Sequence, residues 1–305
     1  MSAVPPGFAF RGPGLDRAEL LRENPGELDA RWPSARVLVV DAEGQARFHR
    51  PPKETAPATG AEASPEDVIC TGSRLAAERP ATASLLGLDG ETAWFVLPHE
   101  ALDEPLPGRL GVREAAATWP ALPASALAQA RALVHWQQRN RHCGGCGEAV
   151  VFGRAGYSAR CPGCGLEHYP RTDPAIIVAV SDGPRLLLGR QASWPPGRWS
   201  VLAGFVEPGE SLEQAIAREV MEEASVPVHS SCYSGSQPWP FPGSLMVGFH
   251  AVGEPVEPQV SDELEQVRWF SKAELEAAVA SGELKLSPRL SIARTLIEEW
   301  LAQQG

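Results

Sequence analysis

Four cysteines in two closely spaced pairs constrain the middle of this 305-residue chain more than any other feature. They follow the pattern C-x2-C-x14-C-x2-C, at Cys143, Cys146, Cys161 and Cys164, and each pair lies in a glycine-rich turn. Two such turns bring four thiolates to the tetrahedral spacing of a structural zinc site. Because four sulfur ligands leave no open coordination position, we expect the ion to stabilise this short segment rather than to catalyse. Incidental cysteine pairs or a redox dithiol are the alternatives.

The composition limits the remaining possibilities. Hydrophobic residues make up 43% of the chain, which is enough for a globular protein with two domains. The formal net charge of −11 argues against a basic, duplex-gripping protein, so an anionic substrate would need a local cation. The first ten residues lack the pattern of a signal peptide, and apolar runs such as 175–180 are too short to cross a membrane. Because four of the six cysteines are paired as CxxC, we expect a reducing, cytoplasmic location.

The pattern of strands, turns and helices predicts four parts, with an α/β fold class overall. They are a β-rich N-terminal domain at 1–122, a linking helix at 123–140, a zinc ribbon at 141–169 and an α/β/α sandwich with a mixed sheet at 170–305. In the first part we expect strands at 36–41, 68–70 and 92–97, with turn-rich chain at 51–67.

The last part alternates short apolar runs with amphipathic segments. Strands are expected at 175–180, 185–190, 199–207, 244–252 and 267–270, and helices at about 212–224, 271–282 and 287–302. Ser271 and Glu274 form a predicted capping box. For the last helix we expect Ser287 as the N-cap and Pro288 as the first helical residue.

The helix at 212–224 crowds three carboxylates together. Its apolar stripe is Leu212, Ile216 and Val220, and Glu219, Glu222 and Glu223 fall within roughly 100° of arc beside it. Like charges at this spacing repel, whereas a divalent cation would convert the repulsion into binding, since Mg²⁺ and Mn²⁺ prefer carboxylate oxygens. The alternative is a solvated acidic face in which Arg218 pairs with Glu222.

The surroundings of this helix resemble a known family. The residues that fit the pattern G-x5-E-x7-R-E-U-x-E-E-x-x-U, where U is aliphatic, are Gly204, Glu210, Arg218, Glu219, Val220, Glu222, Glu223 and Val226. This pattern resembles the Nudix box of hydrolases that act on nucleoside diphosphates. One position departs from it, because Ser225 stands where the family usually has glycine. Ser at a left-handed position could cost about 1 kcal/mol.

A second segment indicates which subfamily of the family the chain resembles. The sequence SQPWPFPGS at 236–244 would, out of context, indicate a stiff loop or a polyproline-type partner motif. After a Nudix box it resembles the signature of the NADH pyrophosphatase subfamily, whose members also carry a four-cysteine zinc ribbon directly before the Nudix domain. The resemblance is strong over about 135–300, and residues 1–115 match only in length and position.

The resemblance implies roles for individual residues. Those implied to hold Mg²⁺ or Mn²⁺ are Glu219, Glu222, Glu223, Glu263 and the carbonyl of Ala203, with Arg218 holding the glutamates in place and Glu222 or Glu223 as the base. Those implied to contact the dinucleotide are Gln237, Pro238, Trp239, Pro240, Phe241, Pro242, Gly243, Ser244 and the backbone at Ala293. Tyr169 and Phe205 match an aromatic pair that sandwiches the adenine, although without the resemblance both would be ordinary core aromatics.

The implied activity is metal-dependent hydrolysis of the NAD(H) pyrophosphate to AMP and nicotinamide mononucleotide, and removal of NAD caps from RNA 5′ ends, by a homodimer. Residues 131–171 carry six arginines and two acids, which suits either RNA contact or a solvated ribbon face. Two other functions stay open. One is a zinc-ribbon nucleic-acid-binding protein with an inactive Nudix half, and the other is hydrolysis of another nucleotide such as an ADP-sugar or a diadenosine polyphosphate.

Overall fold

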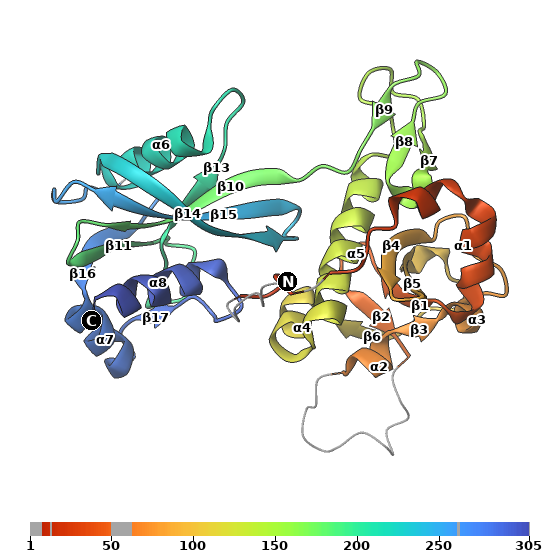
Figure 1. Cartoon of the computed structure of the whole chain (residues 1–305), viewed down its shortest axis with the longest axis horizontal. Helices are drawn as coiled ribbons and strands as arrows, with labels where there is room; N and C mark the ends of the chain where they lie inside the picture. Colours follow the sequence, from red (N-terminus) through yellow and green to blue (C-terminus); the bar gives the residue numbers. More distant parts are fainter. Residues whose placement is uncertain (1–7, 13, 50–62, 261–262, 305) are drawn as a thin grey trace. The chain divides into compact units, whose positions relative to one another are not determined.

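The structure, a computed structural model, describes residues 8–12, 14–49, 63–260 and 263–304 (Figure 1). Most of the turn-rich stretch predicted at 51–67 lies outside the described residues. The chain divides into two compact units. The C-terminal unit comprises Met1–Arg11, Thr172–Trp239 and Ser244–Gly305, and the N-terminal unit comprises Gly12–Arg171 and Pro240–Gly243. Within the described ranges, the helices are all too short or too polar to cross a membrane.

A six-stranded mixed sheet forms the centre of the C-terminal unit. Its strands are β10 (Asp173–Ser181), β11 (Arg185–Arg190), β13 (Leu202–Phe205), β14 (Val228–Trp239), β15 (Ser244–Gly253) and β16 (Gln266–Ser271). The order is β14-β15-β10-β11-β16, with β13 paired to β10. The pair β10–β15 is parallel and the other pairs are antiparallel, so the predicted mixed sheet is confirmed. Two short strands, β12 (Arg198–Trp199) and β17 (Lys285–Leu286), pair separately in parallel.

Alternation along β10 builds two cores, one on each face of this sheet. Ile176 and Val178 pack in the core that includes α6 (Leu212–Ala224), whereas Ile177 and Ala179 pack in the core that includes α8 (Ile292–Gln303). Helix α7 (Lys272–Ser281) contributes Leu275 to the second core. Figure 1 shows α6 on one face of the sheet and α7 and α8 on the other. The predicted α/β/α sandwich is therefore confirmed.

The N-terminal unit is built on a second sheet, in the order β4-β5-β1-β2-β6 with β3 paired to β1. Its strands are β1 (Arg36–Val40), β2 (Ala46–Phe48), β3 (Cys70–Thr71), β4 (Ser84–Asp89), β5 (Thr92–Pro98) and β6 (Gly108–Leu110). The helices are α1 (Pro25–Arg31), α2 (Pro65–Val68), α3 (Gly72–Leu75), α4 (Val112–Thr118) and α5 (Ala121–Arg139). Short 3-10 turns lie at Glu19–Glu23, Trp32–Ser34, His99–Ala101 and Arg154–Gly156. The β-rich N-terminal half is thus confirmed.

The cysteine-rich segment folds as a three-stranded antiparallel sheet within this N-terminal unit. Its strands are β7 (Val151–Gly153), β8 (Ser158–Arg160) and β9 (Glu167–His168). Each cysteine pair lies in a turn that flanks these strands, and the backbone N–H groups of Gly147 and Gly165 donate to the carbonyls of Cys143 and Cys161. Both glycines have positive φ, which explains the glycine after each pair.

Three details of the sequence prediction were wrong. Ser287 does not cap the last helix, because α8 begins at Ile292 with Ser291 as its N-cap. Ser287 is instead buried against Ser200. The strand predicted at 199–207 is broken between β12 and β13, and the strand predicted at 68–70 starts only at Cys70, since α2 reaches Val68.

Candidate active site and four-cysteine cluster

The acidic residues of helix α6 lie in three different environments. A capping box begins this helix: the Gln214 backbone N–H donates to Ser211 Oγ at 3.2 Å, and the Ser211 N–H donates to the Gln214 side chain at 2.8 Å. The apolar stripe of α6 fixes the rotation of the helix against the sheet. As a result, Glu223 is buried with 5% of its surface exposed, Glu219 is half-buried and Glu222 is exposed.

Arg218 lies at the centre of an ion-pair network. Its Nε and Nη2 donate to the two carboxylate oxygens of Glu210 at 2.8 and 3.0 Å, and Nη2 also donates to the carbonyl of Phe205 at 2.9 Å. Its Nη1 donates to Glu219 Oε1 and to Glu222 Oε2, each at 3.0 Å. The Arg218–Glu222 pair of the alternative interpretation is therefore present, but only as one contact of this network. The sequence pattern contained Glu210 and gave no reason for it, and the network supplies the reason.

Gly204 lets the Glu219 carboxyl group lie directly against strand β13. A Cβ atom added at Gly204 would lie 1.8 Å from Glu219 Cδ and about 2 Å from both carboxylate oxygens. The φ of Gly204 is not in the left-handed region, so the requirement for glycine at this position is spatial. The backbone of β13 and the carboxylate of Glu219 together form one wall of the site.

Glu223 is the least compensated acid of the group. Burial raises the pKa of its carboxyl group to about 8, and the charges of Glu219 and Glu263 add to the rise, although the backbone N–H of Ala203 lowers it. Burial also raises the pKa of Glu219, against the opposing effect of Arg218. Among the described residues, Glu223 Oε2 is a buried oxygen without a hydrogen-bond partner. Such an atom is costly unless a cation or proton compensates it.

We call Glu219, Glu222, Glu223 and Glu263 the glutamate cluster. Glu263 comes from the chain before β16, and its charge raises the pKa of both Glu219 and Glu223, so it lies within electrostatic range of these two acids of α6. Composition or periodicity could not have found Glu263, and only the family resemblance pointed to it. Oxygen donors, one of them buried and unpartnered, fit a hard divalent cation such as Mg²⁺ or Mn²⁺.

The predicted substrate segment 236–244 closes a β-hairpin. Residues 236–239 end β14, Pro240–Gly243 form the turn, and Ser244 begins β15, with Trp239 paired to Ser244. The segment is therefore the end of a hairpin, in which only Pro240–Gly243 lie outside the strands. The amide of Gln237 is fully buried: Nε2 donates to the carbonyls of Ala9 and Leu290, and Oε1 accepts from the N–H of Ile292.

The other predicted contacts differ in exposure. Phe205 in the C-terminal unit and Tyr169 in the N-terminal unit are 59% and 53% exposed, which is unusual for large aromatic rings and argues against the alternative of core residues. Ala293 is buried as the second residue of α8. Substrate contact by Gln237, Tyr169, Phe205 and Ala293 stays a prediction.

The four cysteines converge as the spacing predicted. Their sulfur atoms all lie within 4.8 Å of one another, with 3.6 Å between Cys143 and Cys164 and 3.3 Å between Cys146 and Cys161. Backbone N–H groups of Gly145 and Cys146 lower the pKa of the Cys143 thiol to about 6. The N–H of Glu148 lowers the pKa of Cys146, but the thiols of Cys161 and Cys164 raise it to about 12. Four sulfurs this close cannot all ionise without a cation, and a tetrahedral zinc ion fits them.

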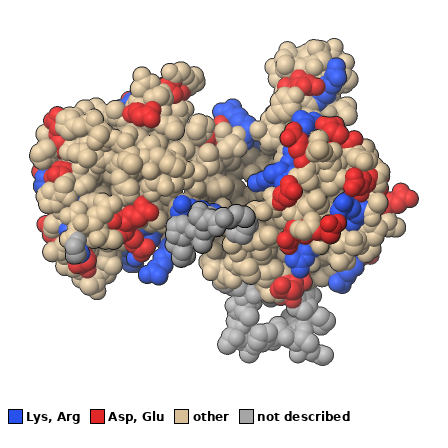
Figure 2. Space-filling view, viewed as in Figure 1, with Lys and Arg blue, Asp and Glu red and all other residues tan. Residues whose placement is uncertain are grey.

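The arginines of 131–171 are only partly available to a ligand. Arg131 donates to backbone carbonyls, and Arg154 pairs with Glu19 and Glu23. Arg139, Arg141 and Arg160 are exposed. Figure 2 shows acidic and basic side chains interspersed over the face of the N-terminal unit in view. Local pairing thus reduces the excess of positive charge that residues 131–171 carry.

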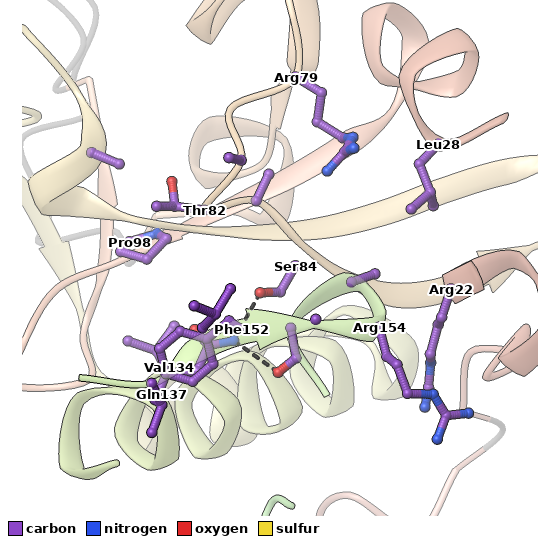
Figure 3. Close-up of a pocket in the computed structure, with 18 of the residues that line it drawn as sticks. Arg22, Leu28, Arg79, Thr82, Ser84, Pro98, Val134, Gln137, Phe152 and Arg154 are labelled. Atoms are coloured by element: carbon purple, nitrogen blue, oxygen red, sulfur yellow. Dashed lines mark hydrogen bonds between the residues drawn. The ribbon is translucent and has the colours of Figure 1, made fainter. Parts of the chain in front are cut away.

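A cavity of about 810 Å³ lies in the N-terminal unit, between the sheet, α5 and β7 (Figure 3). Apolar side chains including Phe152 line it, together with arginines. Arg79 is paired with Asp29 and Arg154 with Glu19, so these guanidinium groups give the cavity little preference for an anion. The glutamate cluster does not line it.

Comparisons with known proteins agree with this arrangement. The model of the NUDIX domain matches residues 170–290, and the model of the NADH pyrophosphatase zinc ribbon domain matches residues 138–169. The chain is 37% identical over 313 residues to NAD-capped RNA hydrolase NudC of Mycobacterium bovis, covering 95% of this chain and 93% of that protein. The chain belongs to the Nudix hydrolase family.

Other known proteins are similar to parts of this Nudix hydrolase. NAD-capped RNA hydrolase NudC of Stutzerimonas stutzeri is 48% identical over 181 residues, which is 58% of this chain and 62% of that protein. The crystal structure of a NUDIX hydrolase from Nitrosomonas europaea matches with a TM-score of 0.45 and 22% identity, covering 54% of this chain and 92% of that chain. The family recognised from 204–226 is confirmed by the NUDIX domain model and by the Mycobacterium bovis relative.

Proposed function

We propose that this Nudix hydrolase cleaves the pyrophosphate of NAD(H) to AMP and nicotinamide mononucleotide, and removes NAD caps from RNA 5′ ends by the same cut. Two of the relatives reported above are named NAD-capped RNA hydrolase NudC. The observation that carries the proposal is the buried Glu223 carboxylate with its unpartnered oxygen, whose carboxyl pKa the charges of Glu219 and Glu263 raise further. This arrangement is unfavourable in an empty site and favourable around a divalent cation.

Glu219, Glu223, Glu263 and the carbonyl of Ala203 would hold Mg²⁺ or Mn²⁺. Bound there, the cation would neutralise the diphosphate and lower the pKa of a water molecule for attack on phosphorus. Arg218 keeps one oxygen each of Glu219 and Glu222 in place and balances part of their charge. Gly204 gives the Glu219 carboxyl group the room that it needs.

We assign different roles to the two neighbouring acids of the pattern. Glu223 is buried and lacks another compensating charge, which suits a metal ligand. The Glu222 side chain is 61% exposed, so it can meet a substrate-side water and accept its proton. This assignment predicts that Glu222→Gln keeps metal binding and loses turnover, whereas Glu223→Gln loses both.

The proposal extends to the assembly and its surroundings. We propose a homodimer that shares its site, because Tyr169 and Phe205 are large exposed rings that a partner surface or an adenine ring would cover. Sedimentation measurements would show a dimer if this is so and a monomer if it is not. The four thiols need to stay reduced to hold zinc, which favours a cytoplasmic location.

The direct test is release of AMP from NADH, measured by chromatography with Mg²⁺, with Mn²⁺ and without either. We expect metal-dependent release that falls at least about 1,000-fold in the Glu222→Gln/Glu223→Gln double variant. Glu213→Gln is the matched control, since Glu213 lies on the same helix outside the glutamate cluster. NAD-capped RNA, ADP-ribose and diadenosine polyphosphates are compared by kcat/KM. Turnover that persists in the double variant, or a clear preference for ADP-ribose or a diadenosine polyphosphate, would contradict the proposal.

A further inference from the structure

The turn Pro240–Gly243 differs from the strands on either side of it. Strands β14 and β15 belong to the C-terminal unit, whereas the turn that joins them packs with the N-terminal unit. Pro240 is buried there, and Phe241 is half-buried. The substrate-lining segment of the proposed function is thus held at its tip by residues that lie outside the sheet that carries it.

Arg131, in the middle of α5, makes the polar contacts of this tip. Its Nε donates to the carbonyl of Pro240 at 2.6 Å. Its Nη1 donates to the carbonyls of Glu43 and Gly44, at 3.2 and 3.0 Å, in the turn between β1 and β2. One guanidinium group therefore binds two turns, which lie 87 to 109 positions from Arg131 in the sequence. A planar fork of donors can serve several carbonyls at once, whereas a lysine ammonium cannot do so in the same geometry.

The ring of Phe241 is held by the same cation and by a second one. The guanidinium carbon of Arg131 lies 5.1 Å from the centre of the ring, and that of Arg113 on α4 lies 4.3 Å from it. These distances are typical of cation–π contacts. The like charge of Arg113 and the burial of the group both lower the pKa of Arg131, so the fork is retained although its surroundings disfavour a cation.

The missing side chain of Gly44 leaves the space that the Arg131 side chain occupies. Its φ of 76° lies in the left-handed region, and an added Cβ would lie 2.7 Å from Arg131 Nη1 and 2.9 Å from its Cγ. Gly44 is therefore constrained twice, by backbone conformation and by the Arg131 side chain. Gly90, in the turn between β4 and β5, has a φ of 57° and nothing within 4 Å of an added Cβ, so it carries the first constraint alone.

We propose that Arg131 is a positioning residue, which holds the Pro240–Gly243 turn against the Glu43–Gly44 turn and so keeps the segment 236–244 in its substrate-binding shape. This inference rests on the proposed function, in which that segment lines the dinucleotide site. A turn that is ordered in advance lowers the entropy that substrate binding would otherwise have to cover.

The test compares three variants with two matched controls. Arg131→Ala and Arg131→Lys remove the fork, and Arg139→Ala removes an exposed arginine from the same helix. Gly44→Ala displaces the Arg131 side chain, while Gly90→Ala imposes the same kind of backbone strain without that clash. For each, KM and kcat with NADH, the Tm, and amide hydrogen exchange of peptides covering 236–244 are measured.

We expect Arg131→Ala and Gly44→Ala to raise the KM for NADH about tenfold with kcat within about twofold. Exchange at 236–244 becomes faster in both, and Arg131→Lys rescues neither property fully. Arg139→Ala and Gly90→Ala keep the KM and the exchange rate of the wild type. Unchanged KM and unchanged exchange in Arg131→Ala would overturn the proposal, as would a fall in Tm with faster exchange throughout the chain and no change in KM. If the wild type releases no AMP from NADH, the proposed function fails, and the exchange at 236–244 still decides whether Arg131 holds the turn.

Discussion

At the scale of single residues, the site depends on how each carboxyl group is compensated. Arg218 compensates Glu210 and parts of Glu219 and Glu222, whereas Glu223 is buried with an unpartnered oxygen. The sequence indicated which acids share a face of α6. It could not show which of them would be buried, because that depends on the sheet against which α6 packs.

The first prediction concerns pH and stability. The folded-state pKa of Glu223, about 8, lies above the value of about 4.3 expected for an unfolded glutamate. Between these values the folded chain binds more protons, so its stability falls as pH rises through this window in the absence of divalent metal. We expect Glu223→Gln to abolish most of this loss and to be more stable than the wild type by ~2 kcal/mol at pH 8. Denaturant unfolding of both proteins at pH 5 and pH 8 measures the loss of stability. A loss between these pH values that is equal in the wild type and in Glu223→Gln would contradict the prediction.

The second prediction concerns the space at Gly204. In Gly204→Ala the new methyl group would overlap the Glu219 carboxyl group, so the carboxylate must leave its place against β13. We expect kcat/KM for NADH to fall at least about 100-fold while the fold is kept, because the overlapped atoms end a flexible side chain. Gly14→Ala is the control, since nothing lies within 4 Å of its added Cβ. Activity within about threefold of the wild type would show that the position of Glu219 is unimportant.

At the scale of elements, amphipathic helices with capping residues were predicted best. The apolar stripe of α6 and the capping box of α7 were confirmed, because the sheet buries one face of α6 and local hydrogen bonds define the start of α7. Strand β14 was missed altogether, because its first eight residues, VHSSCYSG, are polar and carry no apolar alternation. Its pairing with β15 determines it, and such pairing is not visible in a single segment. The start of α8 was misplaced because Pro288–Ser291 forms a turn instead of a first helical turn.

The third prediction concerns the end of α6. Ser225 has φ 55° and ψ 32°, which is the left-handed conformation for which the family pattern has glycine. Its N–H still donates to the carbonyl of Met221, so the cap is formed at a conformational cost. We expect Ser225→Gly to raise the free energy of unfolding by about 1 kcal/mol without a change in kcat. Thermal or denaturant unfolding would show this, and a destabilised Ser225→Gly variant would be evidence against a strained cap.

At the scale of the whole molecule, the sequence predicted the parts better than their connections. The sandwich, the β-rich half and the four-cysteine sheet follow from periodicity and spacing. The assignment of the Pro240–Gly243 turn to the N-terminal unit depends on contacts of Arg131 with Pro240 and Gly44, which are far from it in sequence. Such contacts are long-range and involve ordinary residue types, so they carry no local signal.

The fourth prediction concerns the cysteine cluster. We expect one zinc ion per chain, and Cys146→Ser or a strong chelator should remove it. Without the ion, the close thiols should protonate or separate, and amide exchange at 141–169 should become fast while strands β10 and β15 stay protected. Metal analysis with hydrogen-exchange mass spectrometry measures both effects. Slow exchange at 141–169 in the zinc-free protein would mean that the ribbon folds without metal.

The central claim is that the glutamate cluster binds a divalent cation, which compensates the charge of the buried Glu223. Titration of the zinc-loaded chain with Mg²⁺ by calorimetry, at pH 7 in buffers of different ionisation enthalpy, measures the protons released on binding. The raised pKa of Glu223, about 8, predicts release of about one proton per cation bound, whereas Glu223→Gln should show no binding of Mg²⁺ in the same titration. Binding of Mg²⁺ without proton release, and with equal affinity in Glu223→Gln, would contradict the account.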